Sequence, residues 1–192
     1  MRYTKIPENA FKELQLNAGV ILSTFDPEAP AFENSAIIGA TTGGVNFSAV
    51  PSFSDFGEDI DNAPRNVKEL KQFELWDINM SGTFITITPN SIKRSVGVAD
   101  VDEEDPTHII PRSILDDADF QDIWWVGDYS DKNDEENGGF VAIHMMNALS
   151  TSGFTLQSSD RAKGQFAFEF TAHYSIADQT VVPFEVFVRA GA

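Results

Sequence analysis

The segment GQFAFEFTAHYS, residues 164–175, alternates between aromatic side chains and smaller or polar ones. Every second position in its centre is a phenylalanine: Phe166, Phe168 and Phe170. Successive side chains of a β-strand point to opposite faces, so this spacing places the three rings on one face. That face needs an apolar core, and therefore a second layer to cover it. The other face, with Glu169 and Thr171, needs a polar environment. The alternatives are open solvent, a ligand and an enclosed channel.

The same period of two recurs in short runs separated by turn-forming residues, a pattern typical of antiparallel strands in a sandwich or barrel. The runs expected to form strands are residues 19–25, 36–41, 45–50, 74–88, 122–129, 139–149, 164–175 and 181–188. A chain of 192 residues can form one domain with a substantial core, so we expect residues 1–192 to be a single domain. The predicted fold class is mainly β, an antiparallel sandwich or barrel with a little helix.

One α-helix is predicted, with Thr88 as its N-cap, Pro89 at its first position and Gly97 at its end. A short helical turn is also expected after Asn9. Gly82 interrupts the alternation of its strand as a bulge or kink would.

Two hairpins are predicted. Gly43 and Gly44 are expected at the tip of the first, between the second and third expected strands. The acidic segment Asp131–Gly138 is expected at the tip of the second, between the fifth and sixth, as a solvated outer loop.

The charge excludes one large class of partner. The chain has 13 basic and 30 acidic residues, a net charge of −17, and fourteen of the acidic residues lie between Asp100 and Glu136. Phosphates would be repelled by almost every face of such a chain, so we do not expect tight binding of DNA or RNA. With no cysteine, disulfides and thiolate zinc sites are excluded. No signal peptide or membrane-spanning run is recognised, so we expect synthesis in the cytoplasm.

A search for ligand-binding motifs identifies no site. The three histidines, His108, His144 and His173, lack the short spacings of a zinc or iron site. The acidic segment 131–139 has carboxylates at roughly calcium-loop spacing, but Glu136 stands where that loop needs glycine.

Motifs for catalysis are equally lacking. Residues 55–57 read DFG without the other kinase motifs, and GATTGG at 39–44 lacks the lysine that a phosphate-binding loop requires. No G-x-S-x-G elbow occurs. We therefore predict no catalytic, cofactor-binding or metal-binding residue, no cofactor, and a protein that is not an enzyme.

Two long blocks of the chain resemble a known family. The run from DIWWVGDYSD at residue 122 to VVPFEVFV at residue 188, with Lys163-Gly164 leading into the phenylalanine strand, is similar to the C-terminal half of the major tail tube proteins of long-tailed phages and prophages of Gram-positive bacteria. The run IIGATTGGVNFSAVPSFSDFGEDIDNAPRNVKELKQFELWDINMSGTFITIT is similar to the N-terminal half. The resemblance covers nearly the whole chain.

The resemblance implies a β-sandwich or flattened barrel with one helix, of which six copies close into rings that stack into a hollow tube. It implies a location in the virion after assembly in the host cytoplasm. The implied partners are further copies of the chain and the tape-measure, tail-terminator and baseplate or distal tail proteins, and no membrane. DNA would pass through the lumen without specific binding, past Glu169 and Thr171 as candidate lumen-facing residues.

The stretch from Pro51 to Gln72 has no clean period and is expected to be a long loop. Such loops are usually functional or disordered, and the apolar Phe53, Phe56 and Ile60 argue against disorder. They are the candidate residues of an arm that reaches a neighbouring subunit. The alternative is a loop that folds back on its own domain.

Two other classes of function remain open. A monomeric carbohydrate- or receptor-binding sandwich would need an aromatic platform, for which the candidates are Trp76, Trp124, Trp125 and Tyr129. Because Trp124 and Trp125 are adjacent, they point to opposite sides of a strand, and at most one belongs to any platform. A hydrolase would need two acidic residues brought together in a cleft as acid and base.

Overall fold

The computed structural model describes residues 5–31, 33–129 and 138–191. Its strands are β1 (Gln15–Leu22), β2 (Ile37–Gly39), β3 (Thr41–Asp55), β4 (Lys71–Phe84), β5 (Ala99–Val101), β6 (Ile109–Pro111), β7 (Gln121–Tyr129), β8 (Gly139–Ser150), β9 (Thr155–Gln157), β10 (Gln165–Thr171) and β11 (Phe184–Arg189). The helices are α1 (Pro89–Val96) and the one-turn 3₁₀ helices η1 (Ala10–Lys12), η2 (Asn34–Ala36), η3 (Lys68–Leu70) and η4 (Asp117–Asp119).

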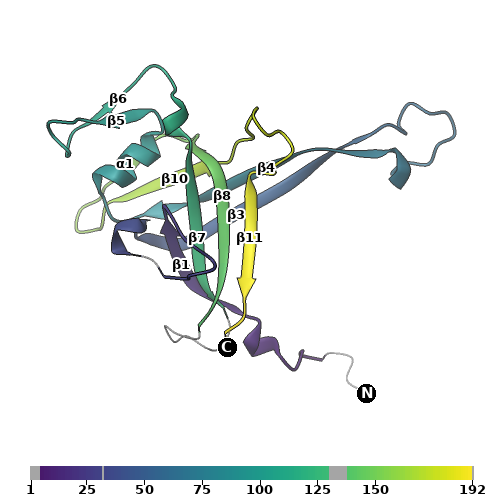
Figure 1. Ribbon diagram of the computed structural model, residues 1–192, viewed down its shortest axis with the longest axis horizontal. Coiled ribbons are helices and arrows are strands. Elements are labelled where there is room, and N and C mark those ends of the chain that lie inside the picture. Colours follow the sequence, from purple (N-terminus) through teal and green to yellow (C-terminus); the bar gives the residue numbers. More distant parts are fainter. Residues whose placement is uncertain (1–4, 32, 130–137, 192) are drawn as a thin grey trace.

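The antiparallel strands form two layers. The first layer contains β2, β1, β7, β8 and β11, and the second contains β9, β10, β4 and β3. The far end of β8 joins them, because Leu149 and Ser150 pair with β10. The strands of the two layers cross in Figure 1, and the hydrogen-bonded path from β2 to β3 does not close on itself. The predicted fold class is confirmed, in its sandwich form, with α1 as the one α-helix among the described residues.

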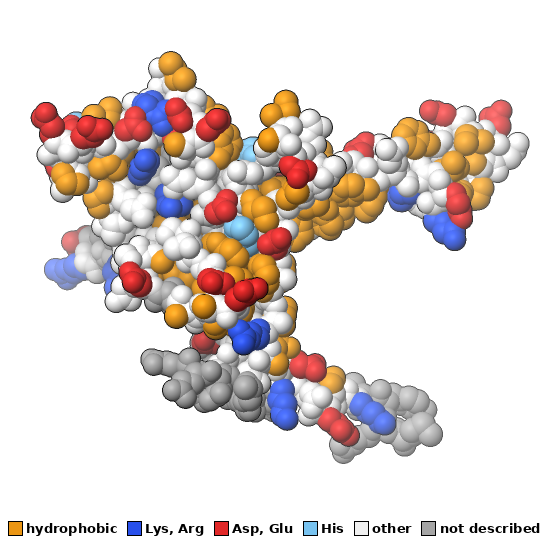
Figure 2. Space-filling view, in the orientation of Figure 1, with side chains coloured by type: hydrophobic (Ala, Val, Ile, Leu, Met, Phe, Trp, Pro, Cys, Tyr) orange, Lys and Arg blue, Asp and Glu red, His pale blue; other side chains and the backbone are white. Residues whose placement is uncertain are grey.

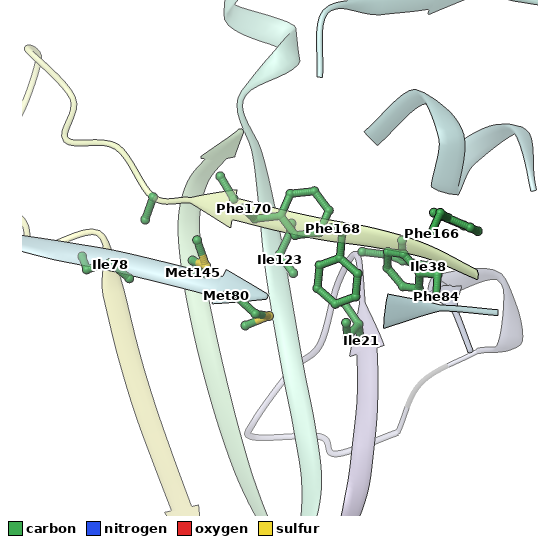
Figure 3. Close-up of a cluster of buried hydrophobic side chains, with 12 residues drawn as sticks. Ile21, Ile38, Ile78, Met80, Phe84, Ile123, Met145, Phe166, Phe168 and Phe170 are labelled. Carbon is green, nitrogen blue, oxygen red and sulfur yellow. The ribbon is translucent and has the colours of Figure 1, made fainter. Parts of the chain in front are cut away.

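The core lies between the layers, and the phenylalanine strand forms much of it. Phe166, Phe168 and Phe170 are each 1% exposed, and the rings of Phe168 and Phe84 lie 4.2 Å apart. Figure 3 shows these rings facing the side chains of the first layer, among them Ile21. The face predicted to need a core has one.

The first layer also buries residues on its other face. Trp124 and Phe140 pack there against Phe25, from the segment that follows β1. Trp125 packs against the main core instead, so the two adjacent indoles lie on opposite sides of β7, as predicted.

The predicted helix is confirmed at both ends. The hydroxyl of Thr88 accepts a hydrogen bond of 3.1 Å from the backbone N–H of Ser91, and Pro89 occupies the first position. The helix stops at Gly97, whose φ of +84° is accessible to glycine without strain. The helical turn predicted after Asn9 is the 3₁₀ helix η1.

The hairpin predicted at Gly43 and Gly44 is wrong. Both glycines lie inside β3, with φ of +76° and +85°, where the register against β4 shifts between Thr42 and Val45. The pair inserts extra residues into a continuing strand, so it forms a bulge instead of a turn. Opposite the bulge, β4 runs unbroken through Gly82, where a Cβ would lie 2.7 Å from the ring of Phe168. Gly82 therefore marks a close approach, and the irregularity predicted there belongs to β3.

The stretch predicted as a loop at residues 51–72 is partly strand. β3 continues to Asp55 and β4 begins at Lys71, so only the segment between them is a loop. The second predicted hairpin is confirmed as β7 and β8, paired from Tyr129 and Gly139. Its acidic tip, with the calcium-loop candidate, falls on residues 130–137, outside the described residues. In the described part of the chain, none of the helices combines the length and the apolar character needed to cross a bilayer.

Candidate functional site

The outward side of the second layer is a polar surface built by strand alternation. The cross-strand rows place Glu169 beside Ser81 and Thr171 beside Asn79. We call this surface the polar face; its residues are Thr42, Asn46, Ser48, Val50, Asp77, Asn79, Ser81, Thr83, Ala167, Glu169 and Thr171. Two of them are acidic, none is basic, and most are small and uncharged. The predicted residues Glu169 and Thr171 both lie on this face.

Side-chain hydrogen bonds run across the polar face. The hydroxyl of Thr151, the residue after β8, lies 2.9 Å from the Thr171 hydroxyl, which donates to Asn79 Oδ1 at 2.8 Å. Asn79 Nδ2 donates in turn to Asp77 Oδ1 at 3.0 Å. These contacts hold the small polar groups in place, so the carboxylates of Asp77 and Glu169 are the charges that the face presents.

The β3–β4 hairpin extends beyond both layers as an arm, which we define as residues 51–75 (Figure 1). It includes the predicted excursion 51–72. The predicted arm residues Phe53, Phe56 and Ile60 are 52%, 60% and 50% exposed. The arm does not fold back on its own layers (Figure 1), so these apolar side chains have no core among the residues that the structure describes.

A continuous row of aromatic rings connects the core to the arm. Phe184 of β11 contacts Trp76 with ring centroids 5.4 Å apart, Trp76 contacts Phe73 at 6.0 Å, and Phe73 contacts Phe53 at 6.1 Å. The row follows the core-facing side of the second layer past the point where the first layer stops covering it. Figure 2 shows the resulting hydrophobic surface along the arm. Contiguous exposed apolar surface of this kind is typical of sites that bind proteins, membranes or ligands.

The histidines lie apart and each has a local partner. His108 is 3.3 Å from Asp102, and His144 lies between Asp122 and Glu185. No group of three metal-ligating side chains occurs among the residues that the structure describes.

The acidic residues give no buried pair in the part of the chain that is described, where Asp119 is the one buried carboxyl. Arg112 Nη2 contacts Asp119 Oδ1, and Asp119 Oδ2 accepts a hydrogen bond from the backbone N–H of Asp116. These contacts give Asp119 a role in holding the loop around η4.

The tryptophans do not form an open platform. Trp124 is 8% exposed and stacks on His144 with ring centroids 3.9 Å apart. Trp125 packs against the main core and its indole N–H donates to the Ala18 carbonyl at 3.0 Å. Trp76 is half-buried in the aromatic row. Intramolecular packing thus occupies the three indole rings that were candidates for such a platform.

Sequence reasoning missed part of the polar face. Asp77, Asn79 and Ser81 share it with Glu169 because β4 pairs with β10, and strand pairing is not visible in the period of either strand. Their alternation with Trp76, Ile78 and Met80 was the available signal.

No family model matches the chain, and no curated protein matches it either. Among solved structures, a chain from the virion of a native gene transfer agent particle is similar over 90% of this chain and 96% of its own length. The two chains share 10% of their residues at a TM-score of 0.42, a likeness too weak to carry an argument about function.

Proposed function

We propose that this chain is a structural subunit of a phage-type tail tube, whose copies close into rings that stack into a hollow conduit for DNA. The polar face carries the proposal: an ordered sheet surface whose two charges are both carboxylates, backed directly by the phenylalanine core. DNA sliding over such a wall finds no cation to bind and releases no counterions on contact. The wall permits passage without adhesion.

Ring closure would use the free edges of the second layer. β3 is an edge strand of this layer, and among the described strands it pairs with β4 alone. An exposed edge of this length pairs readily with another strand, and ring closure would cover it with a neighbouring subunit. Six copies in each ring is the number we propose, and the polar faces of the copies would together line the bore.

The arm would make the contacts between subunits. Phe53, Phe56 and Ile60 expose about half of their surfaces, and burying them against a neighbour would favour assembly. The remaining partners that we propose are the tape-measure, tail-terminator and baseplate or distal tail proteins, with final localisation in the virion.

Sedimentation velocity and negative-stain electron microscopy at high protein concentration test the proposal. We expect rings or tubes with a central hole from the unaltered chain. The variant Phe53→Ala, Phe56→Ala, Ile60→Ala should remain folded and monomeric. The matched control is Ile176→Ala, a 90% exposed apolar residue outside the arm, which should assemble normally. A triple variant that assembles like the unaltered chain would refute the role of the arm.

A further inference from the structure

An acidic surface lies at one end of the molecule. It consists of β5, β6, η4 and their connecting loops, residues 99–119, which we call the acidic apex. This segment contains eight acidic residues and one basic residue, Arg112. It also exposes apolar side chains: Ile110, Ile114 and Leu115. In Figure 2 the acidic apex lies at the left end of the long axis, with acidic and hydrophobic side chains intermixed.

The one cation of the acidic apex is used internally. The Arg112 guanidinium lies 2.7 Å from Asp100 Oδ2, contacts the buried Asp119, and donates to the Ile114 carbonyl at 2.7 Å. The outward side chains therefore present net negative charge. The backbone N–H of Glu104 and the His108 side chain, both hydrogen-bonded to Asp102, hold the pKa of that carboxyl below its usual value.

The tip of the arm carries the densest cluster of cations in the sequence. Residues 65–71 read RNVKELK and hold Arg65, Lys68 and Lys71, three of the 13 basic residues of the chain, together with Glu69, which lies 3.3 Å from Lys68 and leaves the segment with a net charge of +2. All three are exposed. The outgoing side of the same loop carries the acidic residues Glu58, Asp59 and Asp61, so the two sides of the tip differ in charge. The exposed Phe56 and Ile60 lie on that outgoing side.

We propose that the acidic apex of one copy receives the basic side of the arm tip of a second copy, with Arg65 and Lys68 facing its carboxylates. The proposal rests on the proposed function and names the surface that the arm contacts. Complementary charge fixes which surfaces meet, and the exposed Ile110, Ile114 and Leu115 of the apex supply area to bury. Because the chain has a net charge of −17, most contacts between copies are repulsive. A contact between a basic cluster and an acidic one is therefore favoured over the others.

The geometry makes the contact head to tail. The arm tip and the acidic apex lie at opposite ends of the long axis in Figure 1, so one copy cannot satisfy its own pair. After two copies join in this way, one arm tip and one acidic apex are still unpaired, at opposite ends of the dimer. Adding further copies through the same contact yields a closed ring or an open stack.

A charge-swap experiment tests the pairing. The first variant, Arg65→Glu with Lys68→Glu, has an acidic arm tip, and the second, Glu103→Lys with Glu104→Lys, has a more basic apex. Each variant alone should associate at least about tenfold more weakly than the unaltered chain, because like charges then meet. An equimolar mixture should recover association, since the altered surfaces complement each other. The control Arg161→Glu with Lys163→Glu makes the same charge change in an exposed loop elsewhere and should have no effect.

Disulfide trapping tests the contact even where association is weak. The chain has no cysteine, so Lys68→Cys with Ile114→Cys introduces the sole thiols. Oxidation should give a ladder of head-to-tail oligomers joined between positions 68 and 114, and the control pair Lys68→Cys with Arg161→Cys should not. Equal yields from the two pairs would overturn the inference.

The two proposals fail in different ways. Rings from the unaltered chain together with equal trapping yields would refute the apex contact and leave the tail-tube proposal intact. Trapped head-to-tail oligomers without rings or tubes would support the apex contact and refute the tail-tube proposal.

Discussion

Tyr174 is bonded to the base of the arm: its hydroxyl accepts a hydrogen bond of 3.0 Å from the backbone N–H of Trp76, 98 residues earlier in the chain. Regular pairing of β10 with β4 ends at Thr171, and the N–H of Ala172 then donates to the Ile78 carbonyl at 3.1 Å. The Tyr174 side chain continues the contact where the strand has ended. It thus connects the start of the arm to the second layer.

Tyr174→Phe removes this acceptor and keeps the ring. The amide of Trp76 should then exchange its hydrogen about fivefold faster, the equivalent of the ~1 kcal/mol that one hydrogen bond contributes. Hydrogen exchange followed by NMR measures the change, with the amide of Met80 in the same strand as internal reference. Unchanged protection at Trp76 would show that the hydroxyl does not hold the arm base.

Phe168→Ala should lower the free energy of unfolding by about 3–5 kcal/mol, because it leaves a cavity against Phe84 in a closely packed core. Glu169→Ala, one residue away on the polar face, should change it by less than ~0.5 kcal/mol. Urea unfolding of both variants makes the comparison. Equal losses would mean that the two sides of β10 do not differ as described.

Glu169→Lys with Asp77→Lys places two cations on the polar face. If that face lines the bore, tubes of the variant should retain DNA in a way that weakens as salt rises, whereas tubes of the unaltered chain should not. Filter binding of labelled double-stranded DNA across a salt series measures this. The matched control Asp160→Lys with Asp178→Lys makes the same charge change at exposed positions off the face and should retain much less DNA. Equal retention by the two variants would count against the assignment.

Arg112→Leu leaves the Asp119 carboxylate buried without its cation and should cost about 3–5 kcal/mol of stability. Adding Asp119→Asn should recover part of the loss, because no uncompensated charge then remains. Thermal unfolding of the two single variants and the double variant completes the cycle. Strict additivity would show that the two side chains do not interact.

The pKa of Asp102 is lowered by the backbone N–H of Glu104 and, next, by the His108 side chain. Because the pKa of Asp102 is lower in the folded chain than in the unfolded chain, the carboxylate stabilises the fold at pH values above its unfolded pKa. This stabilisation is lost as the pH falls through the folded pKa. Because the hydrogen bond from Glu104 stays, His108→Ala should raise the pKa of Asp102 only part of the way to its ordinary value. NMR titration of the carboxyl measures it; full return to the ordinary value would assign the shift to His108 alone.

Period and cap chemistry predicted the elements whose determinants are local. The three phenylalanines of β10 and the Thr88 cap act through neighbours in sequence, and both predictions hold. Gly43 and Gly44 misled, because glycines with positive φ suit a turn and a bulge equally well. Only the pairing of β3 with β4 decides between the two, and that pairing is a long-range property.

The polar face was partly predictable for the same reason. The alternation in β10 placed Glu169 and Thr171 on the side opposite the core, but which strands lie beside them depends on sheet order. The arm was anticipated as an excursion with apolar residues. Its strands were not predicted, because apolar and polar residues do not alternate regularly in a hairpin that no second layer covers.

Electron microscopy of the purified protein at high concentration, carried through to a reconstruction, would reveal which face of the sandwich surrounds a bore. We predict stacked rings in which the face bearing Glu169 and Asp77 surrounds a central bore. A particle without a bore, or a bore lined by another face of the sandwich, would show that the polar face does not line a DNA conduit.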